Sequence, residues 1–356
     1  MKAGIVGLPQ TGKKTLFQVL TGSEIRDQTG AAKPIPGTAD ITDSRFDTLV
    51  SMYNPKKETK ARLDLVLLPK IEQETIARGD IFREINDVDA ICHIVRAFED
   101  ESIYHEAGSV DPIRDVEMVN SELLMHDQIF IEKRIERLET TIKKIKDDKS
   151  VKELELLQRM QAHLEGEQPL RLMEFTEDED LMIRSYPLIT RKELILAFNV
   201  AEDQLDDTTL LEQVQSICET QKIEAMLVSA QVEAEISQLD SEEEKQEFRQ
   251  DLGIERPALE ILTSLCLKAL GRISFFTVGP DEVHQWLVRV NSPAPVAAGA
   301  IHSDLQRGFI RAEVIKYDEL IEHGSEAELK KVGKFYLQGK DYIVVDGDIL
   351  NIRFKV

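Results

Sequence analysis

Seven residues near the amino terminus have the types and spacing of a phosphate-binding loop. Residues 7–13 read Gly-Leu-Pro-Gln-Thr-Gly-Lys, the spacing G-x-x-x-x-G-K. In such a loop the glycines let backbone N–H groups turn inward around a phosphate chain, and the lysine reaches the terminal phosphates. The loop therefore predicts nucleotide binding through Gln10, Thr11, Gly12 and Lys13; the alternative is a purely structural turn.

The next position departs from this motif. Serine or threonine is required there, because its hydroxyl coordinates the magnesium that bridges the outer phosphates, whereas this chain has Lys14. Thr15 follows, but one helical step turns its side chain by about 100° from that of residue 14, which makes it a poor substitute for the missing hydroxyl. Lys14 can supply positive charge in place of the metal, which permits binding but removes a main source of phosphoryl-transfer catalysis. We expect both residues in the nucleotide site, with Thr15 a candidate metal ligand.

The elements that must position this loop follow from the hydrophobic pattern. Residues 2–6 form a short apolar run before the loop, and residues 14–20 suit a helix that Gly22 ends. Further buried strands are predicted over residues 63–68, 90–95, 194–198 and 225–228. Strands separated by helix-length segments indicate an α/β fold with an open, mainly parallel sheet.

A long charged helical pattern interrupts this alternation between residues 115 and 166. Apolar residues recur from Ile131 in steps of four and three, and resume at Val151, which predicts two antiparallel helices with a coiled-coil seam. Five lysines against two aspartates leave a net charge of +3 at the tip: Lys143, Lys144, Lys146, Lys149 and Lys152. The tip is a candidate contact for RNA or another polyanion; the alternative is a solvated surface.

After Gly271 the pattern changes to short strands. Apolar or alternating runs cover residues 273–278, 312–315, 342–345 and 349–354, separated by turn signals, and residues 317–331 suit a helix. A small mixed β domain is expected.

Composition limits the classes of protein that fit. With 356 residues, 42% hydrophobic and 31% charged, the chain suits two or three globular domains. No apolar stretch is long enough to span a bilayer and no secretory signal is evident, so a cytoplasmic location without membrane contact is expected. The net charge of -22 disfavours general coating of nucleic acid. The three cysteines, Cys92, Cys218 and Cys266, are expected as small apolar residues.

Several longer strings resemble the YchF-type branch of the Obg-like ATPases, which are P-loop GTPases related to translation factors. The strings are Gly-Ile-Val-Gly-Leu-Pro (4–9), Val-Asp-Ala-Ile-Cys-His-Ile-Val-Arg (88–96), Val-Asp-Pro-Ile-Arg-Asp (110–115), Ala-Pro-Val-Ala-Ala-Gly (294–299) and Ile-His-Ser-Asp-Leu-Gln-Arg-Gly-Phe-Ile-Arg-Ala-Glu (301–313). The resemblance extends over essentially the whole chain.

The resemblance implies three parts and a function. They are a P-loop GTPase-like domain over residues 1–114 and 185–271, a coiled-coil arm over 115–184, and a ubiquitin-like β-grasp (TGS) domain over 272–356. Members of the family resemble nucleotide-dependent, ribosome-associated proteins that often prefer ATP to GTP. The implied ligand is therefore ATP or GTP, and the implied partner is the ribosome or RNA, reached through the arm tip and the TGS domain.

The resemblance also implies where the base binds. The family carries N-x-x-E where ordinary GTPases carry N-K-x-D, and residues 199–202 read Asn-Val-Ala-Glu after a predicted strand. Asn199 would contact the base, Val200 its face or edge, and Ser229 with Ala230 would form the loop beneath. Glu202 replaces the aspartate that recognises guanine in ordinary GTPases, but it does not itself provide recognition of adenine. The alternative is that Asn199 merely ends a strand.

The magnesium and switch motifs depart from the family pattern. The D-x-x-G motif corresponds to Asp64-Leu65-Val66-Leu67, without its glycine, which leaves Asp64 as a candidate metal ligand. The switch threonine has only two candidates, Thr29 and Thr38. With Lys14, three elements that hold the metal or sense the γ-phosphate are weakened together.

Three functional hypotheses remain open. The first is a nucleotide-binding protein whose ligand state tunes a ribosome or RNA contact, with weakened hydrolysis. The second is a pseudo-NTPase scaffold that binds no nucleotide, and the third is an active magnesium-dependent ATPase. No catalytic residue can be assigned, and His93, in an apolar strand, is expected to be a hydrogen-bonded core histidine.

Overall fold

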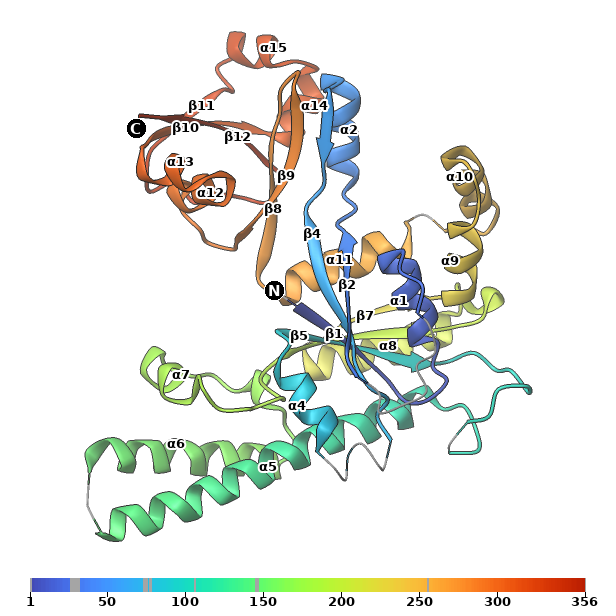
Figure 1. Ribbon diagram of the computed structural model, residues 1–356, viewed down its shortest axis with the longest axis vertical. Helices are drawn as coiled ribbons and strands as arrows, with labels where there is room; N and C mark the ends of the chain where they lie inside the picture. The colour runs from blue at the N-terminus through green and yellow to red at the C-terminus, as the bar shows by residue number, and fades with distance from the viewer. Residues whose placement is uncertain are drawn as a thin grey trace. The chain divides into compact units, whose positions relative to one another are not determined.

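The computed structural model forms two compact units (Figure 1). It describes residues 2–355 apart from 26–32, 73–75, 77–78, 106, 145–146 and 255. The first unit comprises Met1–Thr38 and Asp64–Ala258, and the second Ala39–Leu63 and Leu259–Val356. None of the helices in the described part of the chain combines the length and apolar character that a bilayer-spanning segment needs.

The first sheet has the strand order β2-β4-β1-β5-β6-β7. Pairing is parallel from β4 through β7, which confirms the predicted parallel α/β arrangement. Its strands are β1 (Lys2–Val6), β2 (Ile35–Asp40), β4 (Arg62–Leu67), β5 (Ala90–Arg96), β6 (Glu193–Asn199) and β7 (Glu224–Val228). Every residue of β5 is buried, as expected for a central strand covered on both faces.

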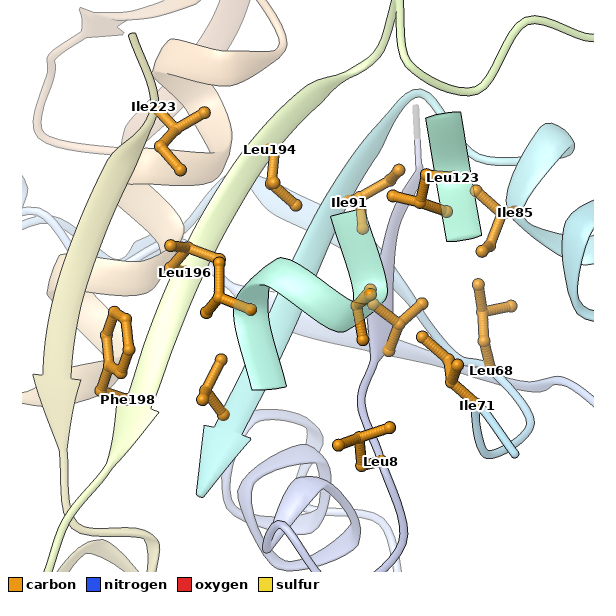
Figure 2. Close-up of a cluster of buried hydrophobic side chains, with 14 of the residues drawn as sticks. Leu8, Leu68, Ile71, Ile85, Ile91, Leu123, Leu194, Leu196, Phe198 and Ile223 are labelled. Atoms are coloured by element: carbon orange, nitrogen blue, oxygen red, sulfur yellow. The ribbon is translucent and has the colours of Figure 1, made fainter. Parts of the chain in front are cut away.

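Helices follow the strands of this sheet along the chain. They are α1 (Lys13–Thr21), α4 (Asp80–Asn86), α5 (Pro112–Lys144), α8 (Thr208–Gln221), α9 (Ala230–Ser237) and α10 (Glu242–Asp251), with the short η2 (Glu202–Gln204). Figure 2 shows Leu123 of α5 beside Ile91 of β5 and Ile85 of α4, in the same cluster as Leu194 and Phe198 of β6. The first turns of α5 thus belong to the core of the first unit.

The rest of α5 pairs with α6 (Asp148–Glu165) to form the arm (Figure 1). The predicted seam is confirmed, because Ile131, Leu138, Leu157 and Leu164 are buried in one cluster. The chain returns through η1 (Leu170–Leu172) and α7 (Glu177–Ile183), which contribute to the same cluster.

One buried carboxylate fixes the root of the arm. Asp127 of α5 is fully buried and accepts hydrogen bonds from the backbone N–H of Ile189 at 2.9 Å and of Thr190 at 2.8 Å. The Thr190 hydroxyl donates a third, at 2.7 Å. The ring of His126 also lies 3.0 Å from this carboxylate. Because Ile189 and Thr190 are held by Asp127 of α5, the entry and exit of the arm are tied together beside β6.

The second unit contains a mixed sheet with the order β11-β10-β12-β8-β9-β3. Its strands are β3 (Lys57–Thr59), β8 (Arg272–Thr277), β9 (Glu282–Arg289), β10 (Phe309–Lys316), β11 (Tyr336–Gln338) and β12 (Asp348–Phe354). The helices are α2 (Ser44–Tyr53), α11 (Ala258–Ala269), α12 (Ala294–Ile301), α13 (Ser303–Arg307), α14 (Tyr317–His323) and α15 (Glu326–Lys331). Small residues of α12, Ala294, Ala297 and Ala298, pack against the sheet.

Some details of this unit differ from the prediction. The run 342–345 forms only an isolated bridge from Ile343 to Pro293, while β9 and β11 were not predicted. The predicted helix over 317–331 is two helices, because Gly324 ends the first with a φ of 74°. Glycine adopts this left-handed conformation without steric cost.

The division into units also differs from the predicted domains. Residues 39–63 were assigned to the P-loop domain, but β3 pairs with β9 in parallel, and Phe46 and Leu49 of α2 share a cluster with Phe276 of β8. The segment therefore belongs to the same unit as the carboxyl-terminal residues. The arm, in turn, is part of the first unit.

Candidate nucleotide-binding site

The loop from residues 7–13 joins β1 to α1, as the sequence predicts. Gln10 has a φ of 58° and Gly12 a φ of 85°, so the chain twice adopts left-handed conformations. A Cβ atom on Gly12 would overlap the side-chain amide of Asn199, and one on Gly7 would lie 2.6 Å from the Ile94 carbonyl oxygen. Both glycines are therefore required for the tight path of the loop.

Lys13 folds back over the loop. Its Nζ donates hydrogen bonds to the Gly7 carbonyl at 2.7 Å and to the Leu8 carbonyl at 3.0 Å. Burial, followed by the charges of Lys70 and Lys14, lowers the pKa of Lys13 to about 7, with Glu72 opposing them. An anion bound beside this buried amine would strongly favour its protonated form.

Asn199, at the end of β6, holds the loop from below. Its Nδ2 donates to the Thr11 carbonyl at 3.0 Å, and its Oδ1 accepts from the Ala230 N–H at 2.9 Å. The alternative in which Asn199 merely ends a strand is wrong, because its amide joins the phosphate loop, β6 and the start of α9. In this structure the visible role of Asn199 is to position the loop; contact with a base stays a prediction.

The segment after β7 forms the opposite wall. Ser229 caps α9 by accepting a hydrogen bond from the Val232 N–H at 3.4 Å. The Val200 N–H donates to the Val228 carbonyl at 2.9 Å, which keeps residues 200–202 next to this turn. Two strand ends that are distant in sequence are thus brought to one edge of the sheet, where ligands bind in α/β folds.

A buried arginine shapes the third wall. Arg96, at the end of β5, donates hydrogen bonds to the carbonyls of Phe98 at 3.1 Å, Ile103 at 3.1 Å and Asp100 at 3.3 Å. Its guanidinium also lies 4.6 Å from the centre of the Phe98 ring. Arg96 is 2% exposed, so the loop that follows is built around it rather than around an apolar core. Sequence reasoning missed this role.

These walls enclose a cavity of about 750 Å³. All of the residues predicted to bind nucleotide line it: Gln10, Thr11, Gly12, Lys13, Lys14, Thr15, Asn199, Val200, Glu202, Ser229 and Ala230. Residues that the sequence did not single out also line it: Lys70, Phe98, Glu99, Asp100, Ile103, Ala201, Gln231, Val232, Ala234 and Glu235. The cavity has the size and mixed polarity of a small-molecule site.

The structure contradicts the assignment of Asp64 to a metal site. In the ladder between β1 and β4, Asp64 pairs with Lys2, whereas Leu67 pairs with Ile5 next to the phosphate loop. Asp64 is exposed and lies three residues before the strand end, about 10 Å away at about 3.3 Å per residue. It does not line the cavity; Lys70, beyond the end of β4, does.

The threonines considered for the metal site lie in different places. Thr15 lines the cavity, whereas Thr38 is exposed on β2 and does not. Thr29 lies outside the described residues. Within the described ranges, no group of three or more histidine, cysteine, aspartate or glutamate side chains could hold a metal ion.

His93 differs from its prediction in one respect. It is buried in β5, as expected, but neither ring nitrogen has a hydrogen-bond partner. Burial, followed by the charge of Lys13, lowers the pKa of His93 to about 3. The ring is therefore neutral, and the expectation of a hydrogen-bonded histidine is wrong.

The predicted tip lysines lie on the two arm helices. Lys143 and Lys144 are in the last turn of α5, and Lys149 and Lys152 in the first turns of α6; all four are exposed. Lys146 lies outside the described residues. Asp147 caps α6 by accepting hydrogen bonds from the Lys149 and Ser150 N–H groups. These N–H groups therefore offset part of the negative charge at the tip.

Comparison with known proteins identifies the family. The chain is 39% identical over 366 residues to "Ribosome-binding ATPase YchF" of Bacillus subtilis (strain 168), with all of both chains covered. It is 35% identical over 365 residues to "Obg-like ATPase 1" of Caenorhabditis elegans, covering all of this chain and 92% of the relative. The chain belongs to the YchF and Obg-like ATPase family.

Two further comparisons agree with this family. The model YchF-GTPase_C, described as "Protein of unknown function (DUF933)", matches residues 272–355. The solved structure of the Schizosaccharomyces pombe YchF GTPase matches with a TM-score of 0.81 and 29% identity, covering 99% of this chain and 97% of that one. The predicted GTPase-like fold is confirmed, and the YchF carboxyl-terminal family model matches the part of the chain that was predicted as the TGS domain.

Proposed function

We propose that the protein binds ATP or GTP in the cavity beside residues 7–13 and acts as a nucleotide-dependent, ribosome-associated protein of the cytoplasm. The observation that carries the nucleotide site is the buried amine of Lys13, placed over a glycine loop at the wall of a cavity of about 750 Å³. The names of its relatives, a ribosome-binding ATPase and an Obg-like ATPase, support the same role.

The walls suggest how a nucleotide would lie. Its phosphates would meet Lys13, Lys14 and the N–H groups at the start of α1, where the helix dipole favours negative charge. The base would lie toward Val200 and the turn at Ser229. Glu202 at this end does not discriminate between adenine and guanine. The binding experiment therefore decides which base is preferred.

Magnesium-dependent hydrolysis is proposed to be weakened. Lys14 stands where a hydroxyl ligand is required, and Asp64 lies away from the cavity. Without a held cation, the charge that develops on the transferred phosphoryl group loses its main stabilisation. Phosphate release slower than that of a family ATPase with serine after the loop lysine is expected, and an equal rate would contradict this part of the proposal.

The arm tip is the proposed ribosome or RNA contact. On a chain with a net charge of -22, a polyanion can bind only where cations gather locally, and four exposed lysines do so around Asp147. Reversing Lys143, Lys144, Lys149 and Lys152 to glutamate should reduce ribosome co-sedimentation. Unchanged co-sedimentation would remove the tip from the proposal.

Calorimetric titration with ATP and GTP, in buffers with and without magnesium, tests the nucleotide site. The Lys13→Met variant should lose at least about 100-fold in affinity, because it removes a charge-assisted contact inside a buried site. Lys133→Met, at an exposed position on α5, is the matched control and should bind normally. If the unchanged chain binds neither nucleotide in either buffer, the pseudo-NTPase scaffold is the correct function.

A further inference from the structure

Three lysines gather at the phosphate end of the cavity. Lys13 and Lys14 begin α1, and Lys70 follows β4 on the neighbouring strand of the sheet; all three line the cavity. Their proximity has an electrostatic signature, since the charges of Lys70 and Lys14 both act on Lys13, with Glu72 opposing them. Glu72 does not line the cavity. The chain thus places three lysines on the wall of the cavity where a phosphate chain would lie.

The position of Lys70 follows from the backbone. The Leu68 N–H donates to the Ile5 carbonyl at 3.0 Å, and the Ile71 N–H donates to the Gly7 carbonyl at 3.2 Å. Lys70 lies between these two hydrogen bonds, so its backbone is held against the phosphate loop. The backbone of Lys70 is therefore fixed at the cavity wall by the sheet.

The donor set at this end does not fit magnesium. Mg²⁺ takes oxygen ligands in a near-octahedral arrangement, and a lysine amine offers it no oxygen. Thr15 is the hydroxyl that α1 brings to the cavity. The carboxylates on the walls, Glu99, Asp100, Glu202 and Glu235, belong to the segments after β5, β6 and β7 and not to the loop or to the end of β4.

We infer that this cavity holds a nucleoside triphosphate as the metal-free anion, with the amines of Lys14 and Lys70 in the place of magnesium. The inference rests on the proposed nucleotide site and specifies the chemical form of its ligand. A free triphosphate carries more negative charge than its magnesium complex, and three amines at one end match that charge. Magnesium in solution then competes with the site for the phosphates instead of assisting binding.

The test is calorimetric titration of the full chain with ATP, in EDTA and in excess MgCl₂ at matched ionic strength. We expect the dissociation constant in EDTA to be lower than that in magnesium. Binding that is equal or tighter with magnesium overturns the metal-free site and leaves the proposed nucleotide site intact. Absence of binding in both buffers overturns the proposed nucleotide site itself.

Two variants make the test specific. Lys70→Ala and Lys14→Ser should each weaken binding in EDTA by about 10- to 100-fold, the loss expected for one hydrogen bond to a charged group. Lys14→Ser should also make magnesium tighten binding, because it restores the hydroxyl of the motif. Lys133→Ala on α5 is the control and should change nothing. Unchanged affinity of Lys70→Ala and Lys14→Ser in EDTA would overturn the inference.

Discussion

Nucleotide affinity should fall as the pH rises from 7 to 9, because of Lys13. Its pKa in the free protein is about 7, lowered by burial and by Lys70 and Lys14 against the opposing Glu72; His93, which Lys13 affects in turn, is neutral throughout this range. A bound polyphosphate favours the charged amine and raises the pKa of Lys13 again. The free protein therefore loses a proton above pH 7 that the complex keeps, so binding takes up a proton.

The magnitude follows from the size of the shift. About half of the free protein is protonated at Lys13 at pH 7 and about 1% at pH 9, so the apparent affinity should fall about 50-fold, or about 2.3 kcal/mol. The nucleotide adds little to this change, since phosphate monoesters have a second pKa near 6 and are about nine-tenths ionised at pH 7.

Calorimetric titration at pH 7, 8 and 9 measures this change. Repeating the titration at pH 8.5 in buffers of different ionisation enthalpy counts the protons, and an uptake close to one per nucleotide is expected. The Lys133→Met control should show the same pH slope as the unchanged chain. A constant affinity from pH 7 to 9, or a release of protons on binding, would refute the reasoning about Lys13.

Three further predictions concern the residues that hold the site and the arm in place. Asn199→Ala leaves the buried Thr11 carbonyl and Ala230 N–H without their partner, so urea unfolding should show a loss of about 2 kcal/mol. Arg96→Lys keeps the charge but not the planar fork, so amide hydrogen exchange in the loop after β5 should become at least about tenfold faster, and an unchanged rate would contradict the role. Asp127→Asn removes an acceptor from the root of the arm and should cost about 1–3 kcal/mol of unfolding free energy; a change below about 0.5 kcal/mol would exclude this anchor.

The positions of the central parallel strands along the chain follow rules that act on short segments. Central strands covered on both faces are continuous apolar runs, and residues 90–95 and 194–198 were predicted within one residue of β5 and β6. The coiled-coil seam could also be predicted, because the 3.5-residue period of its apolar side chains is a property of the helical segments alone. These features need no knowledge of distant contacts.

The second unit was harder to predict, because its pairing is non-local. β3 is three residues long and pairs with β9, more than 200 residues later in the chain. Such a short strand has no sequence signature of its own. Residues 39–63 were therefore assigned by their position in the chain to the wrong unit.

The sequence alone determined the phosphate loop, since its glycine spacing dictates the local backbone and Lys13 follows in the first turn of the helix. Only the tertiary structure decided what surrounds it. The register between β1 and β4 places Lys70 at the cavity and Asp64 away from it. A sequence motif that lacks its glycine gives no information on how these two strands are paired. The walls come from strand ends that meet at one edge of the sheet, so their chemistry becomes visible only once the strands are paired.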